Sequence, residues 1–122
     1  LQALCHQAEV QPAVLQNRLC REAAYDAEAR RFCGLRRIAY QSFCALSGNP
    51  HILGGSAVTS TARRLGWTPE QVWLHFLARC EGVHPLIGTT KLDRMREALL
   101  AVGVVNKALD EGEEVFIRSM LD

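Results

Sequence analysis

The chain has 122 residues, of which 48% are hydrophobic and 22% are charged, and its net charge is +1. Such a composition can bury a core, which excludes a disordered tail, and the length suits one domain or part of a larger one. The nearly neutral, scattered charge argues against a nucleic-acid partner, and no apolar run reaches the roughly 18 residues of a membrane helix.

Three short apolar segments are predicted to be strands, at residues 13–17, 37–43 and 83–87. Each of them ends in polar residues on its carboxyl side. Pro85 weakens the third prediction, because a proline cannot donate a hydrogen bond to a neighbouring strand.

Helical patterns lie between these strands. Residues 21–33 are rich in Ala, Glu and Arg, and Gly34 is predicted to end this helix. A second helix is expected at residues 55–65, with Gly66 as its end.

The next helix begins with a strong local signal. Thr68 is predicted to be its N-cap, Pro69 its first helical residue and Gln71 the partner of a capping box. The apolar positions of residues 72–80 then follow helical spacing, and Gly82 closes the segment.

Two further helices complete the chain. One covers about 91–102, and the spacing of Asp110 and Glu113 begins the last. Strands alternate with helices, which predicts βαβ units and parallel strands. Because parallel sheets are normally covered on both faces, three strands with helices on one side indicate part of a larger α/β structure.

The cysteines favour no disulfide framework and no zinc site. They are odd in number, widely spaced and without a C-x-x-C pair, so we interpret them as reduced thiols of a cytoplasmic protein. The start at Leu1-Gln2, without Met or a signal-peptide pattern, indicates a fragment or a processed chain. The five are Cys5, Cys20, Cys33, Cys44 and Cys80.

The segment Gly88-Thr89-Thr90 lies between the third strand and a helix. Such a turn can hold a phosphate at a helix N-terminus, or it can be a simple turn in which a threonine caps the helix. The residue pattern alone favours the simple turn. Arg94, one helical turn further on, is on the same grounds an ordinary surface arginine that pairs with Asp93 or Glu97.

Four segments resemble, in order and in spacing, the C-terminal half of aldo-keto reductases. The resemblance implies that residues 1–122 form one half of a (β/α)8 TIM barrel. This half comprises strands six to eight with their helices and an extra C-terminal helix, while the N-terminal half is absent. The segments are "VQPAVLQNRLC" (10–20), "FCGLRRIAYQSFCALSGNP" (32–50), "GWTPEQVWLHFLARCEGVHPLIGTTKLDRMREALLAVG" (66–103) and "ALDEGEEVFI" (108–117).

The resemblance also implies that the chain binds NADP (as NADPH). Gln16 matches the glutamine that hydrogen-bonds the nicotinamide carboxamide. Gln41, Ser42 and Phe43 match the motif that ends strand seven, where a serine holds the pyrophosphate and an aromatic ring stacks on the nicotinamide. Either Phe43 or Tyr40 can be that ring.

The strand-eight loop supplies the other expected contacts. By the resemblance, Gly88, Thr89 and Thr90 bind the adenosine 2′-phosphate, Arg94 stacks on the adenine and contacts that phosphate, and Glu97 lies near the adenine amino group. Many members of the family have a lysine where Gly88 stands, so the preference for NADP over NAD is expected to be moderate.

The family's catalytic Asp, Tyr, Lys and His lie in the absent half, so this chain is expected to be inactive alone. Its partners would be the missing half-barrel, or another chain that covers the open sheet edges, and an aldehyde or ketone substrate in the intact enzyme. An alternative is a non-catalytic half-barrel that serves as a structural or interaction module. Self-association of two half-barrels is a third reading.

Overall fold

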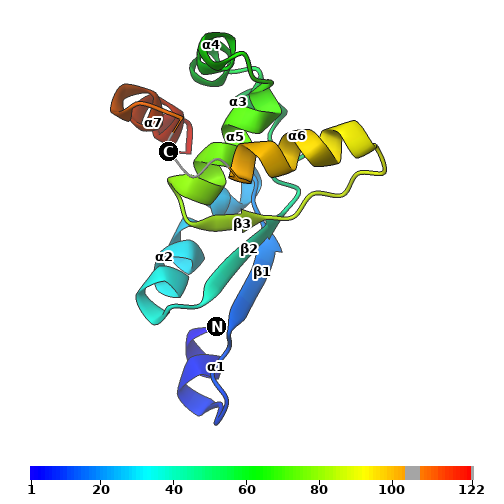
Figure 1. The fold of residues 1–122 in the computed structure, drawn as a ribbon. Coiled ribbons are helices and arrows are strands. Elements are labelled where there is room, and N and C mark those ends of the chain that lie inside the picture. Colours follow the sequence, from blue (N-terminus) through cyan, green and yellow to red (C-terminus); the bar gives the residue numbers. More distant parts are fainter. Residues whose placement is uncertain (104–107, 122) are drawn as a thin grey trace.

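The structure, a computed structural model, describes residues 1–103 and 108–121. Its sheet has three parallel strands in the order β1-β2-β3, which confirms the predicted parallel arrangement (Figure 1). The strands are β1 (Val14–Arg18), β2 (Ala39–Phe43) and β3 (Val83–Pro85). The third strand is shorter than predicted, and its pairing ends where the Leu86 N–H donates to the Ser42 carbonyl at 2.7 Å.

Helices make up most of the remaining chain. Among them, α2 packs on β2 and α5 packs on β3, while α1 lies beyond the amino end of β1 (Figure 1). No helix in the described ranges is both long enough and apolar enough to cross a membrane. The elements are α1 (Gln2–Gln7), η1 (Arg21–Asp26), α2 (Ala27–Arg36), α3 (Pro50–Leu53), α4 (Ser56–Leu65), α5 (Pro69–Arg79), α6 (Leu92–Gly103), α7 (Glu111–Arg118) and η2 (Ser119–Leu121), where η marks a 3₁₀ helix.

Three of the predicted helix ends are confirmed. The Gln71 N–H donates to the Thr68 hydroxyl at 3.2 Å, and the Thr68 N–H donates to the Gln71 side chain at 2.9 Å. The same reciprocal pair joins Asp110 and Glu113 at 2.8 and 3.0 Å. Gly66 ends α4 in the left-handed conformation, with φ of 66°.

The prediction of one helix at 21–33 is wrong at its start. Residues 24–26 have φ values of 46°, 49° and 52°, which break the helix before α2 begins at Ala27. A tertiary contact holds this turn, because the Asp26 carboxylate accepts hydrogen bonds from the Asn17 amide and the Tyr40 hydroxyl, both at 2.8 Å. Left-handed backbone is costly for residues other than glycine, so contacts from the sheet must offset that cost.

The predicted end of that helix is also wrong. Gly34 lies inside α2, and the helix continues to Arg36. The left-handed C-cap is Arg37, with φ of 55°, whose N–H donates to the Cys33 or Gly34 carbonyl.

The core lies between the helices and one face of the sheet. Trp73, fully buried in α5, donates its indole N–H to the Ala45 carbonyl at 2.9 Å, and Trp67 packs at the edge of the core. Both tryptophans therefore serve packing. Cys5, Cys20 and Cys33 are buried as small core residues.

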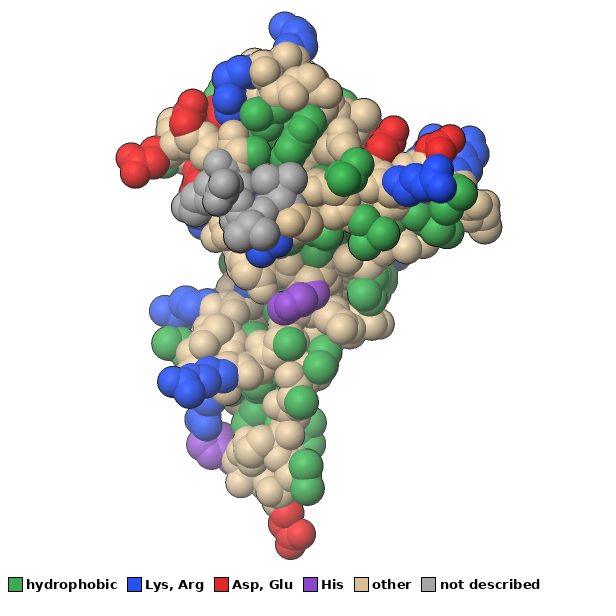
Figure 2. All heavy atoms as spheres, in the orientation of Figure 1, with side chains coloured by type: hydrophobic (Ala, Val, Ile, Leu, Met, Phe, Trp, Pro, Cys, Tyr) green, Lys and Arg blue, Asp and Glu red, His purple; other side chains and the backbone are tan. Residues whose placement is uncertain are grey.

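The other face of the sheet is open. Val14, Gln16 and Arg18 of β1 are exposed, and the strand register places Gln16 beside Gln41 and Gln41 beside His84. Hydrophobic side chains lie along the visible surface over the strands and α6 (Figure 2). This uncovered face agrees with the prediction of a part of a larger α/β structure.

Candidate functional site

A groove of about 1020 Å³ lies at the carboxyl ends of β2 and β3. Its walls are the loops that follow these strands, the first turn of α5 and the first half of α6. Parallel α/β proteins bind ligands at this end of their strands, because loops and helix N-termini meet there.

The groove brings together five of the nine predicted site residues, namely Phe43, Gly88, Thr89, Arg94 and Glu97. They come from two strand ends and one helix, so the fold joins segments that are far apart in the sequence. Gln16, Gln41, Ser42 and Thr90 do not line it.

The loop before α6 differs from a simple capped turn. The Lys91 N–H donates to the Thr89 hydroxyl at 3.2 Å. Because α6 begins only at Leu92, Thr90 is not the N-cap of this helix. Gly88 has no positive φ, and a Cβ atom there would meet no atom within 4 Å. Neither backbone conformation nor packing therefore requires a glycine, and the position has room for a larger side chain.

Arg94 does not form the surface pairs that the residue pattern favoured. Asp93 instead lies 3.8 Å from the guanidinium of Arg96. Within residues 1–103 and 108–121, the Arg94 side chain has no hydrogen bond or ion pair. Its guanidinium is thus available to an anionic ligand in the groove.

Another part of the groove wall is formed by the start of α5. The Gln71 side chain donates to the Glu97 carbonyl at 3.3 Å, which ties α5 to α6 at the groove. Glu70 and Leu74 also line this wall. Sequence reasoning missed Glu70, because nothing near it in the chain indicates a neighbour in α6.

A polar row crosses the open face of the sheet below the groove. The Gln16 amide donates to the Gln41 side-chain oxygen at 3.3 Å. Phe43 follows on the same face of β2, two residues after Gln41, and the Arg18 guanidinium lies 5.9 Å from its ring centre. Phe43 therefore links the glutamine pair to the groove.

Strand alternation sends Tyr40 and Ser42 to the other, helix-covered face. Tyr40 is 3% exposed and donates its hydroxyl to Asp26, and burial together with this carboxylate raises the pKa of the phenol. Ser42 is fully buried, and its hydroxyl has no hydrogen-bond partner among the residues that the structure describes. Tyr40 and Ser42 therefore lie on the face of the sheet opposite to that of Phe43, and neither lines the groove.

Within the described ranges, no group of three or more His, Cys, Asp or Glu side chains is arranged to hold a metal ion. The site offers instead one guanidinium, hydroxyl and amide groups, and apolar walls. Such a set suits an elongated ligand with an anionic end and a flat apolar part.

No protein-family model and no curated protein sequence matches the chain. Solved structures do match. An aldo/keto reductase from Brucella melitensis is 20% identical, with a TM-score of 0.79 over 100% of this chain. An aldo-keto reductase of the silkworm Bombyx mori, solved in complex with NADPH, is 18% identical with a TM-score of 0.71 over 97% of this chain. The aldose reductase of Schistosoma japonicum is 19% identical with a TM-score of 0.73 over 98%.

The chain spans only 44%, 38% and 37% of the lengths of these three structures. At this level of identity, the likeness concerns the fold. The three parallel strands with their helices thus have the fold of part of an aldo-keto reductase (β/α)8 barrel.

Proposed function

We propose that the chain is the C-terminal, NADP-binding half of an aldo-keto reductase. In the intact barrel, the enzyme would reduce aldehydes and ketones to alcohols by hydride transfer from NADPH. The observation that carries this proposal is the groove in which the guanidinium of Arg94 lies with the Gly88–Thr89 loop.

The groove fits the adenosine end of the cofactor. Arg94 supplies a charge-assisted donor for the 2′-phosphate, and the Thr89 hydroxyl adds a neutral one. Leu53, Leu74 and Ile87 offer apolar surface to the adenine ring. These features support a nucleotide more than a small anion, which would leave the apolar walls unused.

The open sheet face fits the nicotinamide end. A carboxamide has one acceptor oxygen and donor N–H groups, as a glutamine side chain has. The hydrogen bond between Gln16 and Gln41 uses the amide nitrogen of Gln16 and the side-chain oxygen of Gln41. The Gln16 oxygen and the Gln41 amide nitrogen stay available to a ligand. The Phe43 ring, 37% exposed, lies beside this pair and can stack on a flat heterocycle.

In this proposal, the other half of the barrel supplies the proton donor and the substrate pocket. NADPH, when bound, supplies the hydride. Residues of this chain bind and orient the cofactor, while the catalytic Asp, Tyr, Lys and His of the family would come from the complementary half.

The exposed apolar surface favours a second candidate, a non-catalytic half-barrel that serves as a structural or interaction module. Leu92, Leu99 and Leu100 of α6 are 57%, 69% and 66% exposed. Exposed apolar patches and unpaired strand edges commonly mark surfaces for other proteins. Such a module would need no cofactor.

Replacing Arg94 tests the first proposal. Arg94→Ala should weaken NADPH binding about 10- to 100-fold, the usual range for one charge-assisted hydrogen bond, and should affect NADH much less. Fluorescence titration with both cofactors, with and without a complementary N-terminal half, measures this. Arg96→Ala is the matched control, because Arg96 lies on the same helix but outside the groove.

Equal losses for NADPH and NADH would contradict the 2′-phosphate role of Arg94. A wild-type chain that binds neither cofactor, even with the complementary half present, would contradict cofactor binding. That outcome would favour the interaction module.

A further inference from the structure

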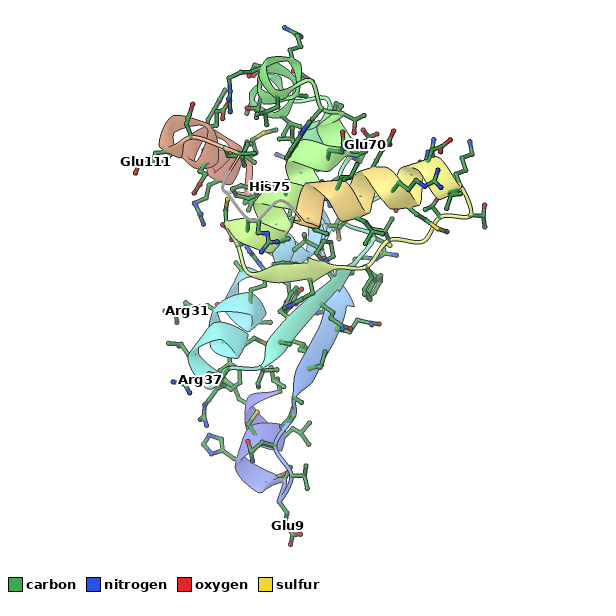
Figure 3. All side chains as sticks on the ribbon, in the orientation of Figure 1. Glu9, Arg31, Arg37, Glu70, His75 and Glu111 are labelled. Carbon is green, nitrogen blue, oxygen red and sulfur yellow. The ribbon has the colours of Figure 1, made fainter. Side chains whose placement is uncertain are left out.

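Glu70 is a groove residue for which the proposed cofactor contacts give no role. It is the second residue of α5, and α5 packs along α6. In Figure 3, Glu70 lies at the end of α5 next to α6. Within the described part of the chain, its carboxylate forms no hydrogen bond or ion pair.

The backbone around Glu70 is held in place. The capping box of Thr68 and Gln71 encloses it, and the Gln71 side chain then reaches the Glu97 carbonyl of α6 at 3.3 Å. Arg94 is on α6 one helical turn before Glu97, so these two side chains share a face of the helix. Glu70 is next to Gln71 in α5, and Arg94 is one turn from Glu97 in α6. Both residues are therefore close to the hydrogen bond that joins the two helices.

The groove has more acidic than basic side chains, which is unusual for a phosphate site. Among the described residues that line it, Glu70 and Glu97 are acidic and Arg94 is the one basic residue. A phosphate monoester carries a charge of about −1.5 to −2 at pH 7. Charges within roughly 8 to 10 Å of each other are only partly screened at physiological salt.

We infer that Glu70 determines specificity by opposing a 2′-phosphate in the groove, and thereby lowers the preference for NADP over NAD. This inference rests on the proposed function. We do not assign the same role to Glu97. The proposal places Glu97 at the adenine amino group, from which its carboxylate can accept a hydrogen bond. Glu70 has no such partner in the ligand.

The test compares 2′,5′-ADP with 5′-AMP, two adenosine ligands that differ by the 2′-phosphate. Glu70→Gln should tighten 2′,5′-ADP about two- to fivefold, the range for one exposed charge pair, and leave 5′-AMP nearly unchanged. Calorimetric titration of the full chain, with and without the complementary N-terminal half, measures both ligands. In 1 M NaCl the difference should vanish, because screening then acts over about 3 Å.

The matched control is Glu111→Gln. Glu111 is also an acidic residue in the first turn of a capped helix, α7, and lies away from the groove (Figure 3). This variant should bind both ligands as the wild type does. Circular dichroism spectra should show that both variants keep their helices.

Each remaining outcome counts against the inference in a recognisable way. Equal tightening of both ligands, no change in either, or a change that persists in 1 M NaCl would overturn the role of Glu70 while leaving the proposed function intact. A wild-type chain that binds neither ligand, even with the complementary N-terminal half present, would overturn both.

Discussion

The buried imidazole of His75 joins three parts of the chain through one side chain. His75 is fully buried between α5 and α6 (Figure 3). Its Nδ1 lies 2.8 Å from the Ala101 carbonyl, and its Nε2 accepts from the Ala108 N–H at 3.3 Å. This pattern assigns the proton to Nδ1 and makes the ring a neutral bridge.

Replacement of this ring should be costly. His75→Leu keeps an apolar side chain in place but leaves the buried carbonyl and the N–H without partners, so we expect a loss of about 2–4 kcal/mol in the free energy of unfolding. Urea unfolding, followed by tryptophan fluorescence, measures the loss. His6→Leu is the control at an exposed position and should change stability by less than about 0.5 kcal/mol. A similarly small change for His75→Leu would contradict the bridging role.

At the scale of elements, the C-terminal helix α7 is attached by ion pairs. The Arg64 guanidinium of α4 donates to both carboxylate oxygens of Glu113, through Nε at 2.6 Å and through a second nitrogen. Glu81 accepts from Arg30 of α2 at 2.6 Å and from Arg118 of α7. Such pairs fix the position of a helix that buries few side chains of its own.

The attachment of α7 should depend on pH. The hydrogen bond from Arg64 holds the pKa of Glu113 below its ordinary value of 4.5. A group whose pKa is lower in the folded state contributes stability above its unfolded pKa, and loses that contribution as the pH falls through the folded value. The contribution should therefore be constant from pH 7 to about 5 and decline below about 4.5.

Glu113→Gln isolates this effect. At pH 7 the variant should be less stable than the wild type by about 1 kcal/mol, the upper range for an exposed pair, and the difference should shrink towards pH 3. Thermal unfolding at several pH values measures it, with Glu111→Gln as the control. A difference that stays the same from pH 7 to pH 3 would rule out the ion pair as its source.

For the whole molecule, the sheet is closed on one face and open on the other. The helices cover the side of Tyr40 and Val83, whereas the opposite face carries exposed residues of all three strands. Among the three strands that the structure describes, β2 is paired on both sides, and β1 and β3 are edges. A complete barrel has no edge strands, because its sheet closes on itself. A sheet with the fold of only part of a barrel therefore has two edge strands.

Hydrogen exchange should report this asymmetry. In the isolated chain, we expect the amides of β2 to exchange at least about tenfold more slowly than those of β1 and β3, since local opening at an edge is easier than opening of a central strand. Exchange measured by mass spectrometry tests this. Equal protection of all three strands would mean that the edges are covered, and light scattering would then show whether a second copy covers them.

Much of the fold follows from signals that span only a few residues. The capping boxes at Thr68 and Asp110 and the left-handed end at Gly66 were predictable, because each depends on a side chain and the backbone within one helical turn. The three apolar segments and their alternation with helices likewise predicted a parallel sheet. Even the incompleteness of the sheet was visible, since three strands cannot cover their own faces.

The sequence by itself thus determined the three strands, most of the helices between them and two of the segments that supply the groove, the end of β2 and the loop before α6. Only the tertiary structure decided which side chains reach that groove. Contacts with Asp26 hold residues 24–26 in a left-handed turn. Ser42 lies on the helix-covered face of the sheet, and Glu70 lines the same groove as Glu97. The physical reason is distance along the chain: a cap is settled by near neighbours, whereas these positions depend on segments that meet only when the helices pack on the sheet.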